Sequence, residues 1–452
     1  MFRKAQVYLE KEWIVDQNRK PLVVRGARQV GKTWLARSVA KNTKKQLIEI
    51  NFERDPNLKK LFDGNDPKSI IQNLELFFSK TIDPSKSLLF LDEIQDAPEL
   101  LAKLRWFYEE LPELAVIVAG SLLEFIIQDH AFSMPVGRIT YLHLEPLSFE
   151  EFLRANKKEK LSQFLSDVDK LMEISPMIHE TLTEQFQIYS FIGGMPEAVN
   201  TYIKTQSYES VIKIHQDLLS TYRDDFFKYK GRLEIHRLDS ILKAIPAQLG
   251  EKFVFSKADK NIQAVTAKQI LSLFNKARLA HKVNRALGNS VPLESEIQDK
   301  SFKQIFLDVG LANRALGSVS PFIKNQMQGA ISEQIVGQML RCTFPFFLEP
   351  MLYYWQRDEN GSSAEIDYLI ESNQKIIPIE VKSGSTGSLK SLHSFMFRKK
   401  GKIAVRINND VLSMTEVNVI VENREQVNYK LLSIPFYLTG QLYKLLDTVI
   451  FD

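Results

Sequence analysis

The chain has 452 residues, of which 44% are hydrophobic and 25% are charged; this is typical of a globular protein with about three domains and excludes a disordered or fibrous one. It has no run of eighteen apolar residues and no apolar core near its start, and its single cysteine, Cys342, excludes an internal disulfide bond; we therefore expect a cytoplasmic protein without a membrane partner. The net charge of +4 is too small to indicate a nucleic-acid partner by itself.

The first motif lies at residues 26–33, which read GARQVGKT and match the phosphate-loop (Walker A) pattern G-x-x-x-x-G-K-[ST] at every position. An apolar segment at 21–24 predicts a buried strand before it, and an apolar stripe at 34–40 predicts a helix after it. In such a loop, backbone N–H groups and the start of the helix face phosphate oxygens. The predicted nucleotide-binding residues are Gly26, Ala27, Arg28, Gln29, Val30, Gly31, Lys32, Thr33 and Trp34.

A second motif, of the Walker B type, follows the apolar segment 88–91 as Asp92 and Glu93. A carboxylate at the end of a strand beside the phosphate loop can hold Mg²⁺, so we predict ATP and Mg²⁺ as ligands. Lys32 would neutralise the β- and γ-phosphates, and Thr33 would offer its hydroxyl to the metal that Asp92 also holds. Glu93 would orient or deprotonate the attacking water.

A third buried strand is predicted at 114–119 and is followed by Ser121. In additional-strand NTPases a polar residue at this strand tip contacts the γ-phosphate or the attacking water, which makes Ser121 a catalytic candidate; a helix N-cap is the alternative. Arg138 begins an alternating segment, 138–144, that predicts another strand. It is a candidate for an arginine finger or sensor, and a solvated arginine at a strand edge is the alternative.

These motifs resemble the AAA+ superfamily, and more narrowly the bacterial and archaeal ATPases related to the STAND class of nucleotide-controlled switches. The resemblance covers residues 20 to about 230 and includes the segments EPLSFEEF at 145–152 and GGMPEAV at 193–199. It implies a helical lid after the core, and it implies that Pro196 contacts the nucleotide base, as the proline of the similar GxP motif does. A Gly-Gly-x-Pro turn between helices explains the same residues without a ligand.

A separate group of charged residues lies in the last quarter of the chain. The alternating segments 364–370 and 376–382 predict two strands that can pair as a hairpin, with Asp367 on the first and Glu380 and Lys382 on the second. Glu333, in a helix-like stretch, could bring a further carboxylate to the same place. This layout resembles the PD-(D/E)XK nucleases over residues 329 to 410. A hairpin with salt-bridged charges on its solvent face is the alternative.

The nuclease resemblance implies roles for these four residues. Asp367 and Glu380 would chelate Mg²⁺, Glu333 would be the auxiliary helix acid, and Lys382 would activate water or stabilise charge. The whole chain, in turn, is similar to a widespread prokaryotic family in which an AAA ATPase is joined to a C-terminal domain of unknown function, and that family has no settled activity to transfer.

The predicted fold class is α/β: a P-loop NTPase parallel sheet with a helical lid, and a C-terminal α/β domain like that of restriction endonucleases. Between them, the segment 268–277 fits a winged helix-turn-helix and ordinary helix packing equally well. The predicted domains are the ATPase core at 1–150, the lid at 151–235, the helical or winged-helix-like linker domain at 236–325 and the nuclease-like domain at 326–452.

Three functional hypotheses follow from the sequence, the third being a chaperone-like AAA+ remodeller, which would need ring assembly. In the first, an ATP-binding and ATP-hydrolysing protein controls its nuclease-like domain through its nucleotide state, with DNA as the candidate substrate. In the second, the same ATPase is an interaction switch and the nuclease-like domain is an inert platform for a protein partner, self-association or nucleic acid. The basic clusters at 41–45 and 398–402 fit contacts with a phosphate backbone, but a solvated charged face explains them as well.

Overall fold

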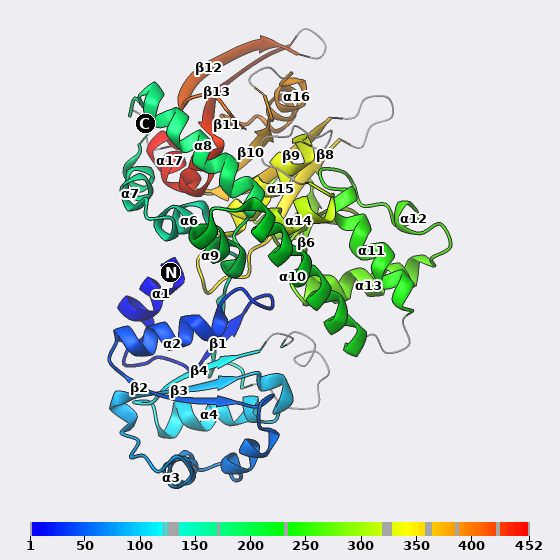
Figure 1. Cartoon of the computed structure of the whole chain (residues 1–452). Coiled ribbons are helices and arrows are strands. Elements are labelled where there is room, and N and C mark those ends of the chain that lie inside the picture. Colours follow the sequence, from blue (N-terminus) through cyan, green and yellow to red (C-terminus); the bar gives the residue numbers. More distant parts are fainter. Residues whose placement is uncertain are drawn as a thin grey trace. The chain divides into compact units, whose positions relative to one another are not determined.

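The computed structural model divides the chain into two compact units (Figure 1). The first consists of Met1–Glu145, Lys276–Arg278 and Pro345–Glu349, and the second of Pro146–Asn275, Leu279–Phe344 and Pro350–Asp452. The structure describes residues 2–120, 123, 135–169, 172–229, 234–318, 328–357, 364–384, 388–421 and 425–450. Within these residues, no helix has both the length and the apolar character that crossing a membrane requires.

The first unit is built on a parallel five-stranded sheet in the order β2-β3-β4-β1-β5. Its strands are β1 (Leu22–Arg25), β2 (Gln46–Asn51), β3 (Ser87–Asp92), β4 (Ala115–Ala119) and β5 (Thr140–His143). Every residue of β3 and β4 is buried, as continuous apolar runs predict for the inner strands of a parallel sheet. This sheet confirms the P-loop NTPase fold that the sequence predicts for this region.

Helices cover both faces of this sheet: in Figure 1, α2 lies over one face, and α3 and α4 lie over the other. The helices are α1 (Lys4–Tyr8), α2 (Lys32–Asn42), α3 (Pro67–Phe78) and α4 (Leu100–Glu110). A hydrophobic core joins Leu101 and Leu104 of α4 to Leu91 and Val118 of the sheet. This core fixes the strand ends, where the predicted nucleotide site lies.

Helices make up the first part of the second unit. They are α6 (Phe149–Ala155), α7 (Glu159–Asp167), α8 (Pro176–Ile192), α9 (Pro196–Thr205) and α10 (Tyr208–Tyr229). Ser148 and Glu151 form a reciprocal capping box at the start of α6, in which each side chain accepts a hydrogen bond from the backbone N–H of the other residue. Ser148 and Glu151 of the segment 145–152 therefore have a structural role, which is to cap this helix.

The next segment contains α11 (Ile235–Ala247), α12 (Phe255–Ala258), α13 (Ala264–Lys276), β6 (Ala280–Ala286) and β7 (Ile297–Phe306). An isolated antiparallel bridge joins Lys252 to Lys303 of β7, so the elements follow the order of a winged helix. The tip of the β6–β7 hairpin is not free, since the Leu293 N–H donates to the Glu371 carboxylate. The hairpin instead extends the C-terminal sheet through parallel pairing of β6 with β8.

That C-terminal sheet is mixed and has eight strands among the described residues, in the order β12-β13-β11-β10-β9-β8-β6-β7. Its remaining strands are β8 (Leu352–Gln356), β9 (Glu365–Ser372), β10 (Lys375–Val381), β11 (Ile403–Asn408), β12 (Ser413–Ile420) and β13 (Gln426–Pro435). The β9–β10 pair is an antiparallel hairpin, as the alternation predicts. The accompanying helices are α14 (Val309–Ala315), α15 (Gln328–Arg341), α16 (Lys390–Lys399) and α17 (Leu442–Ile450).

Candidate nucleotide-binding site

The GARQVGKT loop connects β1 to α2 in the predicted strand–loop–helix arrangement. Gly31 lies directly before the helix with a φ of 99°, a left-handed conformation that glycine adopts without strain. Gly26 is required for another reason, because a Cβ atom there would lie 2.6 Å from the carbonyl oxygen of Leu144. The two glycines therefore allow a loop that closes tightly around the start of α2. Arg28, Gln29 and Trp34 are partly or fully exposed on it.

The side chain of Lys32 folds back into this loop. Its Nζ atom donates to the carbonyl oxygens of Gly26 and Ala27, both at 2.9 Å, and the residue is 8% exposed. Burial lowers the pKa of Lys32 to about 8, although the negative charges of Glu93 and Asp92 act to raise it. An ammonium that donates hydrogen bonds to neutral carbonyls gains stronger partners when an anion enters the loop.

Thr33 and Asp92 lie side by side at the carboxyl edge of the sheet. The Thr33 hydroxyl donates to Asp92 Oδ2 at 2.9 Å, and Asp92 is the buried last residue of β3. Burial raises the pKa of Asp92, and the bond from Thr33 partly opposes that shift. A hydroxyl and a carboxylate are the hard oxygen ligands that Mg²⁺ prefers, so these residues fit the predicted metal.

Glu93 follows in a left-handed backbone conformation, with a φ of 52°, which is rare for a residue with a side chain. Its Oε2 atom accepts a hydrogen bond from Gln95 Nε2 at 2.6 Å. The Oε1 atom of Gln95 is buried and has no hydrogen-bond partner among the described residues. Gln95 therefore fixes one oxygen of the Glu93 carboxylate, and no sequence motif predicted this contact.

The second unit brings the four residues of the nuclease-like pattern into one cluster. Asp367 Oδ2 accepts from the backbone N–H of Val381 at 2.7 Å, and Glu380 Oε1 lies 2.5 Å from Lys382 Nζ. Burial, followed by the charge of Asp367, raises the pKa of Glu380 to about 7 and that of Glu333 to about 8. The sequence therefore predicted the location of this cluster.

Lys303 of β7 also lies in the cluster, and the sequence did not predict it. Its Nζ atom is 3.2 Å from Glu333 Oε2 and 2.5 Å from Glu365 Oε1. Burial alone would lower the pKa of Lys303, but the charges of Glu333 and Glu365 outweigh it and raise that pKa. Across the residues that the structure describes, no three acidic, histidine or cysteine side chains are arranged to hold a metal. Glu333, Asp367 and Glu380 do not form such a group in this structure, and their role as metal ligands stays a prediction.

Comparison with family models assigns three regions of the chain. Residues 18–153 match an AAA domain, residues 183–321 match a domain of unknown function (DUF8612), and residues 328–430 match another (DUF4143). The first match covers the sheet and the loop described above. The chain carries an AAA-type ATPase domain of the P-loop fold. The other two matches assign no activity to the remainder.

Solved structures give weaker likenesses. A Walker-type ATPase of Pyrococcus abyssi is 16% identical with a TM-score of 0.44, and the match covers 70% of this chain and 95% of that one. The RuvB Holliday junction branch migration motor of Thermotoga maritima is 15% identical with a TM-score of 0.31, covering 70% and 94%. No curated protein matches the chain.

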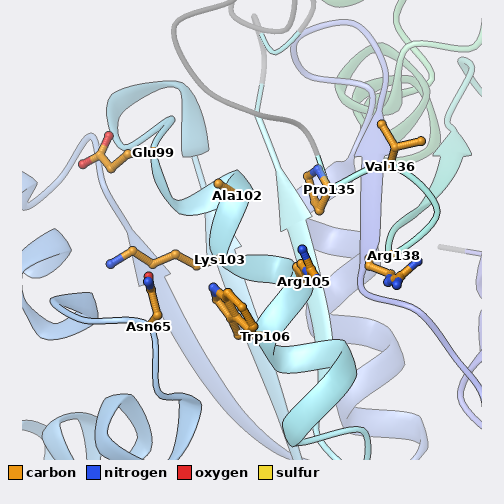
Figure 2. Close-up of a pocket in the computed structure, with 9 residues that line it drawn as sticks. All are labelled: Asn65, Glu99, Ala102, Lys103, Arg105, Trp106, Pro135, Val136 and Arg138. Atoms are coloured by element: carbon orange, nitrogen blue, oxygen red, sulfur yellow. The ribbon is translucent and has the colours of Figure 1, made fainter.

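Arg138 lies away from the nucleotide loop of the AAA domain. It precedes β5, and because β5 is parallel to β1, this is the edge of the sheet opposite to the loop. The Nε atom of Arg138 lies 2.8 Å from Glu109 Oε1, and the Nε atom of Arg105 lies 3.1 Å from the same oxygen. Arg138 and Arg105 line a pocket of about 550 Å³. Figure 2 shows the residues around it. This position does not favour a sensor within the chain, and the catalytic role of Arg138 as a finger or sensor stays a prediction. Ser121 lies outside the described residues.

Pro196 is the first residue of α9 in the second unit, and its contact with a base stays a prediction. The glycines before it have a structural role, because the Gly194 N–H donates to the Asp308 carboxylate at 2.6 Å. A Cβ atom at Gly193 would lie 2.0 Å from Asp308 Oδ1. Asp308 also accepts from the Gly310 N–H at 2.9 Å. The turn between α8 and α9 is therefore explained by its packing around Asp308.

Arg278 is a further buried cation of the first unit, which contains the AAA domain and is called the AAA unit below. Sequence patterns did not indicate it. Its Nη2 atom is 3.1 Å from both His143 Nδ1 and Glu349 Oε1, and its side chain is 5% exposed. His143 is paired in register with Arg25, the residue directly before Gly26. The charge of Arg278 also contributes to the lowered pKa of Lys32. A residue distant in sequence therefore lies beside the phosphate loop.

Proposed function

We propose that the AAA domain binds ATP with Mg²⁺ and hydrolyses it. The observation that carries this proposal is the convergence of the Lys32 ammonium, the Thr33–Asp92 pair and Glu93 at the carboxyl edge of one parallel sheet. In phosphoryl transfer to water, positioning and charge neutralisation supply nearly all of the catalysis. Lys32 and the metal held by the Thr33–Asp92 pair would neutralise charge, and Glu93 would position the water.

Each residue of this site has a distinct task in the proposal. The loop amides and Lys32 bind the β- and γ-phosphates, and Lys32 exchanges its carbonyl partners for phosphate oxygens. Thr33 and Asp92 hold Mg²⁺, which when bound neutralises phosphate charge. Glu93, held by Gln95, orients the water and accepts its proton.

Titration calorimetry and a phosphate-release assay test this proposal on the full chain. We expect heat on adding ATP with Mg²⁺, and release of phosphate that stops when Mg²⁺ is removed by a chelator. ATP binding without any phosphate release would leave a nucleotide-occupancy switch and refute hydrolysis. The absence of both would refute the proposal entirely.

We further infer that the nucleotide state governs the second unit. The support is the path of the chain, which enters and leaves the AAA unit at Lys276–Arg278 and again at Pro345–Glu349. Arg278 is followed within two residues by β6, and Glu349 within three by β8, so both segments continue directly into strands of the C-terminal sheet. A change in partners of Arg278 would therefore act on that sheet through the backbone.

The C-terminal unit has two proposed roles. One is a nuclease-like domain that acts on DNA under the control of ATP, supported by the convergence of Asp367, Glu380 and Lys382. The other is an inert platform that binds a partner, favoured by the position of Lys303 inside the carboxylate cluster. Incubation with plasmid and single-stranded DNA, Mg²⁺ and ATP separates them: cleavage that Asp367→Ala abolishes supports the nuclease, and intact DNA supports the platform.

A further inference from the structure

Lys303 occupies the interior of the carboxylate cluster in the second unit. Its side chain is 4% exposed, and its ammonium bridges Glu333 of α15 and Glu365 of β9 at 3.2 and 2.5 Å. The ammonium also lies 5.4 Å from the centre of the Tyr354 ring. One buried cation thus links a helix and two strands of the C-terminal sheet.

The strand that carries Lys303 is held firmly in this place. The side-chain amide of Gln334, the residue after Glu333, accepts from the Phe306 N–H at 2.7 Å and donates to the Phe306 carbonyl at 2.9 Å. Lys303 itself is paired in register with Val283 of β6. These contacts fix β7 against α15, and the ion pairs with Glu333 and Glu365 hold the ammonium between the strand and the helix.

The oxygens that a metal would need are engaged by other groups. Asp367 Oδ2 accepts from the Val381 N–H, and Glu380 Oε1 is paired with Lys382. Glu333 Oε2 and Glu365 Oε1 are paired with the Lys303 ammonium, whereas Glu380 Oε2 is buried and has no hydrogen-bond partner among the described residues. The described residues contain no group of three acidic, histidine or cysteine side chains that could hold a metal, and Mg²⁺ demands near-octahedral coordination. The residues present therefore do not fit a divalent metal while Lys303 is in place.

We propose that Lys303 is the resident cation of this cluster and occupies the place that a divalent metal would have in a nuclease. A divalent ion that entered would meet a buried positive charge of the protein itself, and displacing that ammonium would leave it unpaired away from water. The cluster is then a structural ion-pair network, and the C-terminal domain binds its partner without cutting it. This proposal does not depend on ATP binding.

Titration of the nucleotide-free full chain with Mn²⁺, followed by electron paramagnetic resonance, tests the proposal. We expect wild type and Asp367→Asn to bind Mn²⁺ identically, because Asp367 is no metal ligand. Lys303→Met should gain one site, at least about tenfold tighter than any in wild type, and Lys303→Met/Asp367→Asn should lack it. Lys282→Met is the matched control, since Lys282 lies on the neighbouring strand and is 34% exposed.

The wild-type measurement can overturn the proposal by itself. If wild type binds one Mn²⁺ that Asp367→Asn loses, the cluster is a metal site and Lys303 is no substitute. This comparison stands even if Lys303→Met fails to fold, which circular dichroism would reveal. If Lys303→Met folds and gains no site, the proposal is also refuted. Any metal that Asp92 binds is common to wild type and Asp367→Asn and cancels between them.

Discussion

The Thr33 hydroxyl donates to the Asp92 carboxylate at 2.9 Å, although 59 positions separate these residues in the sequence. Thr33 lies in the first turn of α2, just after the loop that follows β1, and Asp92 ends β3. Since the strands are parallel, their carboxyl ends lie at the same edge of the sheet. In the proposed function, this pair would hold Mg²⁺ between the phosphate loop and Glu93.

Replacing Lys32 by alanine should weaken ATP binding about 100-fold, because its buried ammonium lies inside the loop that is proposed to bind the phosphates. Titration calorimetry with ATP and Mg²⁺ measures the change. Lys41→Ala is the matched control, since Lys41 is exposed in the last turn of the same helix and should bind as wild type does. Equal affinities for wild type and Lys32→Ala would refute the assigned role.

Replacing Glu93 by glutamine should preserve ATP binding and lower kcat about 100-fold or more, because an amide cannot accept the proton of water. Gln95→Ala should lower kcat less, since it removes only the 2.6 Å bond that orients Glu93. Phosphate release at saturating ATP measures both. Exposed Glu99→Gln is the control. Hydrolysis by Glu93→Gln at the wild-type rate would show that another group activates the water.

Replacing Arg278 by alanine should lower kcat at least about tenfold, because it removes a buried guanidinium from beside the loop. Arg138→Ala should leave kcat unchanged, since Arg138 lies at the opposite edge of the sheet. Circular dichroism checks that both variants fold, and Arg278→Lys should restore only part of the activity, because lysine lacks the planar fork. An Arg278→Ala variant that folds and hydrolyses ATP normally would contradict this role.

The stability of the second unit should depend on pH through Asp308. Burial raises its pKa to about 6, from 3.8, so the folded state prefers the protonated form. The contribution is therefore largest at low pH and is lost as pH rises through 6, by about 2 kcal/mol between pH 4.5 and 7. Because Asn cannot titrate, the Asp308→Asn variant lacks this pH-dependent contribution. The difference in unfolding free energy between wild type and Asp308→Asn, measured by denaturant melts, should therefore change by about 2 kcal/mol between pH 4.5 and 7. A constant difference across this range would contradict the assignment.

The sequence predicted those parts of the site that are encoded locally. The phosphate loop depends on neighbouring glycines and a lysine, and Asp92 follows an apolar strand that could be recognised alone. Glu380 and Lys382 are likewise set by the alternation of one strand. In each case the chemistry lies within a few residues of the pattern that positions it.

The residues that the sequence did not predict are positioned by long-range packing. Arg278 reaches the loop from beyond α13, and Lys303 reaches the carboxylates because β7 pairs at the edge of the C-terminal sheet. No short pattern marks either. The position of Arg138 has a simpler cause: the residue precedes a strand, whereas the groups of a parallel α/β site lie where strands end.

The measurement that tests the central claim most directly is a calorimetric titration of the full chain with ATP and Mg²⁺. We expect one site, saturated below millimolar ATP, and a higher melting temperature of the complex because the ligand binds the folded state. Neither heat nor thermal stabilisation at millimolar ATP would contradict nucleotide binding by the loop from Gly26 to Thr33.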